Sequence, residues 1–114
     1  MLPQRIREHL CKVPRNALPV TYQLLAKALE RSPPNTIHQL TVGLEHLIEE
    51  DAYAARPLIA ALVISKARVG LPAPGFFESA RRVGRFHGEP SGPEASAYYK
   101  AEFNGAVEFW RSPS

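Results

Sequence analysis

The sequence predicts one mostly α-helical domain with a small β component. Its 114 residues are the usual size of a single domain, and a hydrophobic fraction of 45% is ordinary for a globular protein. Apolar residues recur every three or four positions along most of the chain, as they do on the buried face of a helix. Prolines separate these stretches, and two short segments between them are better suited to extended structure.

The first part of the chain predicts a helix, a short extended segment and a second helix. Pro14 ends the first helix, and residues 16–20 are predicted to be extended because Pro19 disfavours helix at the residue before it. Thr21 is the expected N-cap of the second helix, since its hydroxyl can accept a hydrogen bond from an early amide. The apolar faces of the two helices consist of Leu2, Ile6, Leu10 and Val13, and of Tyr22, Leu25 and Leu29.

A third predicted helix carries the most regular apolar pattern in the chain. Pro33 and Pro34 cannot continue the second helix and predict a short turn, after which Asn35 or Thr36 can cap the next helix. We expect that helix to extend to about residue 54. Its apolar face consists of Ile37, Leu40, Leu44, Leu47 and Ile48.

The remaining elements are a short strand and two further helices. The apolar run at residues 58–64 suits a buried strand, although a helix beginning at Pro57 remains an alternative. The extended segment around residues 17–20 is the expected partner of this strand in a small sheet. Residues 76–86 predict a short helix, and Pro93 fits the first turn of a final one.

We expect residues 1–88 to form the core, and residues 89–114 to add a loop and an amphipathic C-terminal helix packed on the same domain. The final helix carries an aromatic face that is too large to be left in water. Docking against the preceding helices is the favoured interpretation, and association with a second copy or another protein is the alternative. The residues of that candidate interface are Tyr99, Phe103 and Trp110.

The order of helix, short strand, helix, proline-containing turn, helix and strand is that of a winged helix-turn-helix. Residues 18–26, Leu-Pro-Val-Thr-Tyr-Gln-Leu-Leu-Ala, resemble the start of the helix-turn-helix in alkylguanine DNA alkyltransferases and their alkyltransferase-like relatives. The resemblance covers about residues 14–55 and implies a winged-helix-like core that contacts DNA. The sequence lacks that family's Pro-Cys-His-Arg active-site motif, and Cys11 lies on a different helix. Alkyl transfer is therefore not implied.

The first functional hypothesis is a small, non-catalytic, DNA-binding regulator or accessory protein whose partner is double-stranded DNA. The net charge of +3 is unevenly distributed, and residues 1–35 and 58–88 are the basic stretches. The third helix is expected to offer base contacts through Asn35, Thr36, His38 and Gln39. The expected phosphate contacts, around a wing after the second strand and on the following helix, are Lys66, Arg68, Arg81, Arg82 and Arg85.

The acidic end of the third helix supports an alternative hypothesis. Its carboxylates would repel phosphate if they lay near the DNA backbone, and they are Glu45, Glu49, Glu50 and Asp51. The alternative is a protein–protein interaction module, an adaptor or inhibitor, that uses the same scaffold without nucleic acid. The acidic helix or the aromatic final helix would then be the docking surface, and a homodimer is compatible with either hypothesis.

The sequence gives no support for an enzyme, a cofactor or a metal site. The four histidines lack the spacing of a ligand set, and Cys11, the only cysteine, cannot form a disulfide within the chain. We find no glycine-rich phosphate loop and no nucleophile elbow. No apolar run is long enough to span a membrane, and the N-terminus lacks a signal peptide's apolar stretch, so we expect a cytoplasmic protein.

Overall fold

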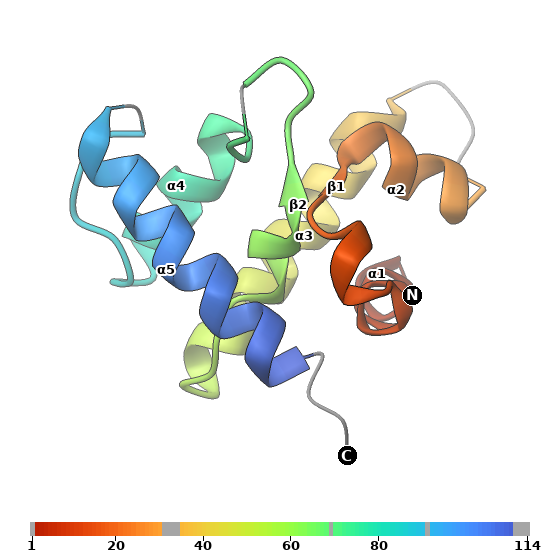
Figure 1. The fold of residues 1–114 in the computed structure, drawn as a ribbon, viewed down its shortest axis with the longest axis horizontal. Helices are drawn as coiled ribbons and strands as arrows, with labels where there is room; N and C mark the ends of the chain where they lie inside the picture. The colour runs from red at the N-terminus through yellow and green to blue at the C-terminus, as the bar shows by residue number, and fades with distance from the viewer. Residues whose placement is uncertain (1, 31–34, 69, 91, 111–114) are drawn as a thin grey trace.

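The structure is a computed structural model, and it describes residues 2–30, 35–68, 70–90 and 92–110. The helices are α1 (Leu2–Lys12), α2 (Tyr22–Ala28), α3 (Thr36–Tyr53), α4 (Pro74–Arg82) and α5 (Pro93–Trp110). Two short 3-10 helices, η1 (Arg15–Ala17) and η2 (Ile59–Leu62), each lie just before a strand, β1 (Val20–Thr21) and β2 (Val63–Ile64). In Figure 1, α1 and α2 lie on one side of the molecule and α4 and α5 on the other, with β2 and α3 between them.

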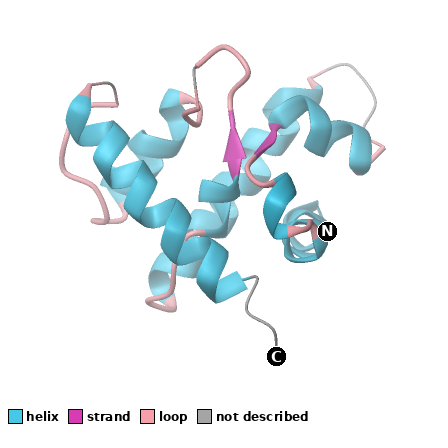
Figure 2. Cartoon of the chain, viewed as in Figure 1, coloured by secondary structure: helices cyan, strands magenta, loops and turns pink. Residues whose placement is uncertain are grey.

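The β component is one pair of two-residue strands within the part of the chain that the structure describes (Figure 2). The strands are parallel, and Val20 is paired with Val63 and Thr21 with Ile64. The predicted mostly helical fold with a small β component is therefore confirmed, as is the pairing of two distant extended segments. After β2 the chain forms a loop, in which the amide of Ser65 donates to the carbonyl of Leu71, at a distance of 2.8 Å. This loop occupies the place where we predicted a wing.

The strand predicted over residues 58–64 is wrong for its first five residues. Residues 59–62 form η2, and all their side chains are buried. The amide of Leu58 donates to Oε2 of Glu102 at 2.8 Å, and the amide of Ile59 donates to Oδ2 of Asp51 at 2.9 Å. Carboxylates from α5 and α3 thus satisfy these two buried amides, which in a strand would be bonded to a neighbouring strand.

The N-terminal elements follow the predicted pattern closely. Ile6 and Leu10 of α1 are completely buried against the core, and α1 packs on α3. The hydroxyl of Thr21 accepts from the amide of Leu24 at 3.1 Å, so the predicted N-cap of α2 is confirmed. The helix ends at Ala28. The turn predicted at the double proline lies outside the described residues.

The third helix begins and ends where it was predicted, within one residue. Leu40 and Leu44 are buried, so the apolar face of α3 is directed into the core. Asn35 stands at the N-cap position with a left-handed backbone, φ 64°, and its side chain makes no capping hydrogen bond. Its carbonyl accepts from the amide of Gln39 at 2.9 Å. Asn35 therefore contributes to the helix start through its backbone.

The last two helices enclose an aromatic cluster. The fourth helix begins at Pro74 and ends at Arg82, so it is shifted towards the N-terminus relative to the predicted range of 76–86. The ring centroid of Phe76 lies 5.2 Å from that of Phe77 and 6.3 Å from that of Tyr99 on α5. Helix α5 also packs along η2. No helix in the described ranges combines the length and apolar character that crossing a membrane requires.

Candidate nucleic-acid interface

The exposed face of α3 begins with two of the four residues that the sequence predicted as base contacts. Asn35 and His38 are exposed, whereas Thr36 and Gln39 are partly buried at the sides of the helix. Val42, one turn after His38, has half of its side chain exposed. Because residues three and seven positions apart share one side of a helix, Asn35, His38 and Val42 form one outward stripe. The sequence analysis did not include Val42, although its position on the polar face of the helix was a signal.

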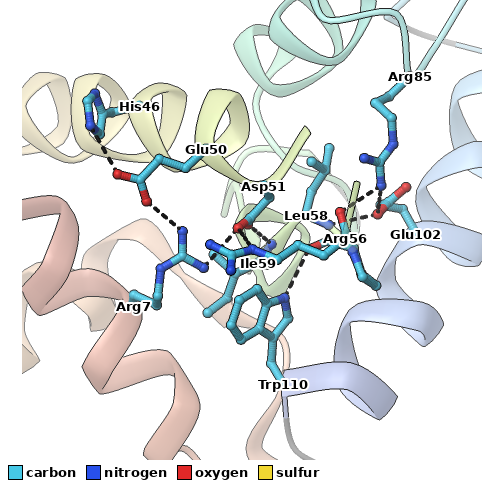
Figure 3. A network of polar contacts seen from close by, with 11 residues as sticks. Arg7, His46, Glu50, Asp51, Arg56, Leu58, Ile59, Arg85, Glu102 and Trp110 are labelled. Carbon is cyan, nitrogen blue, oxygen red and sulfur yellow. Dashed lines mark hydrogen bonds and ion pairs between the residues drawn. The ribbon is translucent and has the colours of Figure 1, made fainter. Parts of the chain in front are cut away.

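The acidic end of the same helix is tied into the protein interior (Figure 3). Asp51 is completely buried. Its Oδ1 lies 2.8 Å from Nε of Arg56 and 2.9 Å from Nη1 of Arg7, the latter an ion pair outside hydrogen-bond geometry. Glu50 receives a hydrogen bond of 3.0 Å from Arg7, and its other carboxylate oxygen lies 3.2 Å from Nε2 of His46. These two carboxylates are thus engaged within the molecule.

The other two acidic residues of α3, Glu49 and Glu45, both lie close to helix α4. Glu49 is exposed and lies 3.9 Å from the guanidinium of Arg82 on α4. Glu45 is partly buried and lines a cavity of about 70 Å³ between α3 and the start of α4. Tyr22, on the same cavity, accepts a hydrogen bond from the amide of Ala73 at 3.2 Å, and burial raises the pKa of this tyrosine. The cavity has room for a few water molecules but is far smaller than the pockets that hold organic cofactors.

Trp110 is held at the centre of the network in Figure 3 rather than presented to a partner. Its indole N–H donates to the carbonyl of Pro57 at 3.0 Å. The guanidinium carbons of Arg7 and Arg56 lie 4.7 Å and 5.0 Å from the centroid of its ring system, which is cation–π geometry. Through these contacts the end of α5 is fixed to α1 and to the segment after α3. The predicted interface role of Trp110 is not supported by this position.

The other two predicted interface residues, Tyr99 and Phe103, also pack within the protein, but they are buried to different extents. Tyr99 is buried against Phe76, so its ring is not accessible to a second molecule. Phe103 is partly buried and lines an open groove between η1 and α5. The groove is lined by Arg15, Leu18, Phe103, Asn104, Val107 and Glu108. The aromatic ring that remains most accessible on α5 is that of Phe109, at 52% exposure.

Two of the five predicted phosphate contacts are structural residues. Arg68 donates to the carbonyl of Pro90 at 2.8 Å and to that of Pro72 at 3.3 Å, and its guanidinium lies over the ring of Phe77. It thereby joins the loop after β2 to the segment before α5. Such long-range contacts leave no sequence signal, because a basic residue in a loop looks the same whether it faces solvent or a carbonyl.

Arg85 is the second of these structural residues. Its Nη2 donates to the carbonyl of Arg56 at 3.0 Å and to Oε2 of Glu102 at 3.3 Å. The side chain is therefore committed to holding α5 against the segment that follows α3. The remaining three predicted phosphate contacts, Lys66, Arg81 and Arg82, are exposed. Lys27 on α2 is exposed as well, and the sequence analysis did not include it.

The described residues contain no cluster of three or more histidine, cysteine or acidic side chains that could hold a metal ion. Comparison with known proteins finds no matching protein family, no similar curated protein and no similar solved structure.

Proposed function

We propose that this chain is a small, non-catalytic DNA-binding regulator or accessory protein that reads duplex DNA with the first half of α3. The observation that carries the proposal is the electrostatic division of this helix. Residues 35–44 contain no acidic side chain, and they include the exposed stripe of Asn35, His38 and Val42. Of the four acidic residues that follow, Glu50 and Asp51 are paired within the molecule, and Asp51 is buried completely.

The dimensions of α3 fit such a role. A helix with its side chains is about 10–12 Å across, which fits the ~12 Å width of the major groove, and residues 36–44 provide about 13 Å of helix to lie in it. His38 and Glu45, the nearest carboxylate of α3, are separated by about 10 Å along the helix axis, slightly more than the ~8 Å Debye length at physiological salt. A phosphate beside the first turn of α3 would therefore be partly screened from the acidic residues.

The phosphate contacts proposed here are a revised set. Lys66 lies in the loop after β2, Arg81 and Arg82 lie at the end of α4, and Lys27 lies on α2 beside α3. Arg68 and Arg85 are left out, because withdrawing them would break their hydrogen bonds to backbone carbonyls and to Glu102. Exposed side chains can reach a phosphate without such a penalty.

The test is a salt titration of binding to a labelled, mixed-sequence duplex, followed by fluorescence anisotropy. The logarithm of the binding constant falls linearly with the logarithm of the salt concentration, and each phosphate contact adds about 0.9 to the steepness of this line. The double variant Lys66→Ala and Arg81→Ala should therefore make the line less steep by about 2. Lys100→Ala is the matched control, since Lys100 is an exposed lysine on α5 outside the proposed interface. Failure of the wild-type protein to bind the duplex at 50 mM salt or below would rule the proposal out.

The second candidate function is a protein–protein interaction module. It is favoured by the open groove between η1 and α5, which has a volume of about 470 Å³ and a partly apolar lining, and by the exposed ring of Phe109 on the same helix. Sedimentation velocity over a range of concentrations tests self-association through this surface. We expect any association to be weakened by Phe109→Ala and unaffected by Tyr53→Ala at the end of α3. A monomer at all concentrations would leave only a different protein as the partner.

A further inference from the structure

The exposed apolar side chains of this protein are unevenly distributed. Among the described residues, those of large size are Leu24, Ile37, Val42, Tyr53 and Phe109. Three of them belong to α2 and the first half of α3, the elements that the proposed function places nearest to DNA. Val42 is the one that lies on the outward stripe with Asn35 and His38, and it is 50% exposed.

A valine at this position contributes little to folding. Its branched side chain loses rotamer freedom in a helix, and alanine, lysine or glutamate would be better helix formers at an exposed site. Half of its apolar surface is in contact with water. The outer part of the side chain is therefore available to an apolar group that approaches from outside the chain.

The major groove presents one apolar group to such a side chain, the C5-methyl group of thymine. We propose that Val42 contacts thymine methyl groups, so that the DNA read by α3 carries thymine opposite its second exposed turn. This inference rests on the proposed function and specifies the base that it reads. His38 lies about 6 Å before Val42 along the helix axis, roughly two base-pair steps of 3.4 Å. The polar contact of His38 and the apolar contact of Val42 therefore fall on different base pairs.

Removal of the methyl group alone tests this inference. Uracil pairs with adenine as thymine does but lacks the C5-methyl group, so a 20-base-pair alternating adenine–thymine duplex is compared with its uracil counterpart. The alternating sequence places thymines under α3 in every register. Burial of one methyl group corresponds to about a fourfold difference in affinity, and we expect the wild-type protein to prefer the thymine duplex by at least this factor.

The variant Val42→Ala links the preference to this side chain. Alanine keeps the helix but removes the two methyl groups that extend outward, so the ratio of the two affinities should fall towards one. Tyr53→Ala is the matched control, because Tyr53 lies on the same side of α3, about 17 Å further along, and is 96% exposed. We expect Tyr53→Ala to leave both the affinity and the thymine preference unchanged.

Three results would overturn the inference. Equal binding of the two duplexes by the wild-type protein, or an undiminished preference in Val42→Ala, would do so while leaving DNA binding itself intact. A loss of thymine preference in Tyr53→Ala as large as that in Val42→Ala would show that the preference does not report a contact made by Val42. Absence of binding to either duplex at low salt would instead remove the proposed function, and the inference with it.

Discussion

Asp51 is a charged residue whose side chain is completely buried. Its carboxylate receives hydrogen bonds from Arg56 and from the amide of Ile59, and Arg7 forms a further ion pair with it. These partners offset the cost of desolvating the charge. They also hold α1 and the segment after α3 against the end of α3. From the sequence, Asp51 was interpreted as one of four acidic surface residues. Only the arrival of α1 and of the segment after α3 makes it an interior residue.

The substitution Asp51→Asn should lower the free energy of unfolding by about 3 kcal/mol, because it leaves two arginines beside a neutral group. Asparagine keeps the size of the side chain and one oxygen for the amide of Ile59, so the effect reports the lost charge. Urea unfolding followed by circular dichroism measures it. Glu49→Gln, which removes the exposed pair with Arg82 at 3.9 Å, should change stability by less than about 0.5 kcal/mol. Equal effects of the two substitutions would contradict the role given to Asp51.

At the scale of elements, the close contact between α1 and α3 depends on a glycine. A Cβ atom added to Gly43 would stand 2.8 Å from Cδ1 of Ile6 and 3.7 Å from Cγ of Leu2. Ile6 is itself completely buried, so it has little room to move. The sequence pattern predicted both helices and their apolar faces, but a glycine inside a helical pattern does not reveal which neighbour approaches it.

We expect Gly43→Val to lower the free energy of unfolding by about 2 kcal/mol, since the branched side chain must displace α1. In hydrogen exchange, the amides of α1 should be the first to lose protection. Gly75→Val is the control, because an added Cβ at Gly75 meets nothing within 4 Å. A similar loss in both variants would show that helix propensity, rather than the packing of α1 on α3, sets the effect.

The segment from residue 58 to residue 62 illustrates the limit of pattern reading at this scale. Its continuous apolar run was interpreted as a strand, because both faces of the segment had to be buried. The burial was predicted correctly, and the backbone conformation was not. Amides bonded to carboxylates of α3 and α5 replace a strand partner here, and neither carboxylate is near this segment in the sequence.

For the whole molecule, buried tyrosines determine how stability depends on alkaline pH. Burial raises the pKa of Tyr99, and the nearby Tyr22 raises it further. The pKa of Tyr22 is raised chiefly by burial as well. In the unfolded chain both hydroxyls ionise near pH 10, the ordinary value for tyrosine. Above that pH the unfolded state releases protons that the folded state retains, so folding becomes less favourable.

We therefore expect the free energy of unfolding to be insensitive to these tyrosines below pH 10 and to fall above it, by roughly 1 kcal/mol per pH unit for each of the two tyrosines. Urea unfolding at several pH values from 8 to 11 measures the slope. The hydroxyl of Tyr99 is buried without a hydrogen-bond partner among the described residues, so Tyr99→Phe should be at least as stable as the wild type at pH 8. The same variant should lose stability less steeply above pH 10. A slope that Tyr99→Phe leaves unchanged would assign the effect to other groups.

Periodicity and capping rules were sufficient to predict the helices, the cap at Thr21 and the buried face of α3, because these features depend on residues that are close together in the chain. They also placed Asn35 and His38 on the exposed side of α3, since that side follows from the same periodicity. Which charged residues face solvent became clear only from the packing of the elements. The partners of Arg68, Arg85 and Asp51 either lie far away in the sequence or show no pattern that identifies them. Whether a charge is exposed or buried depends on those partners.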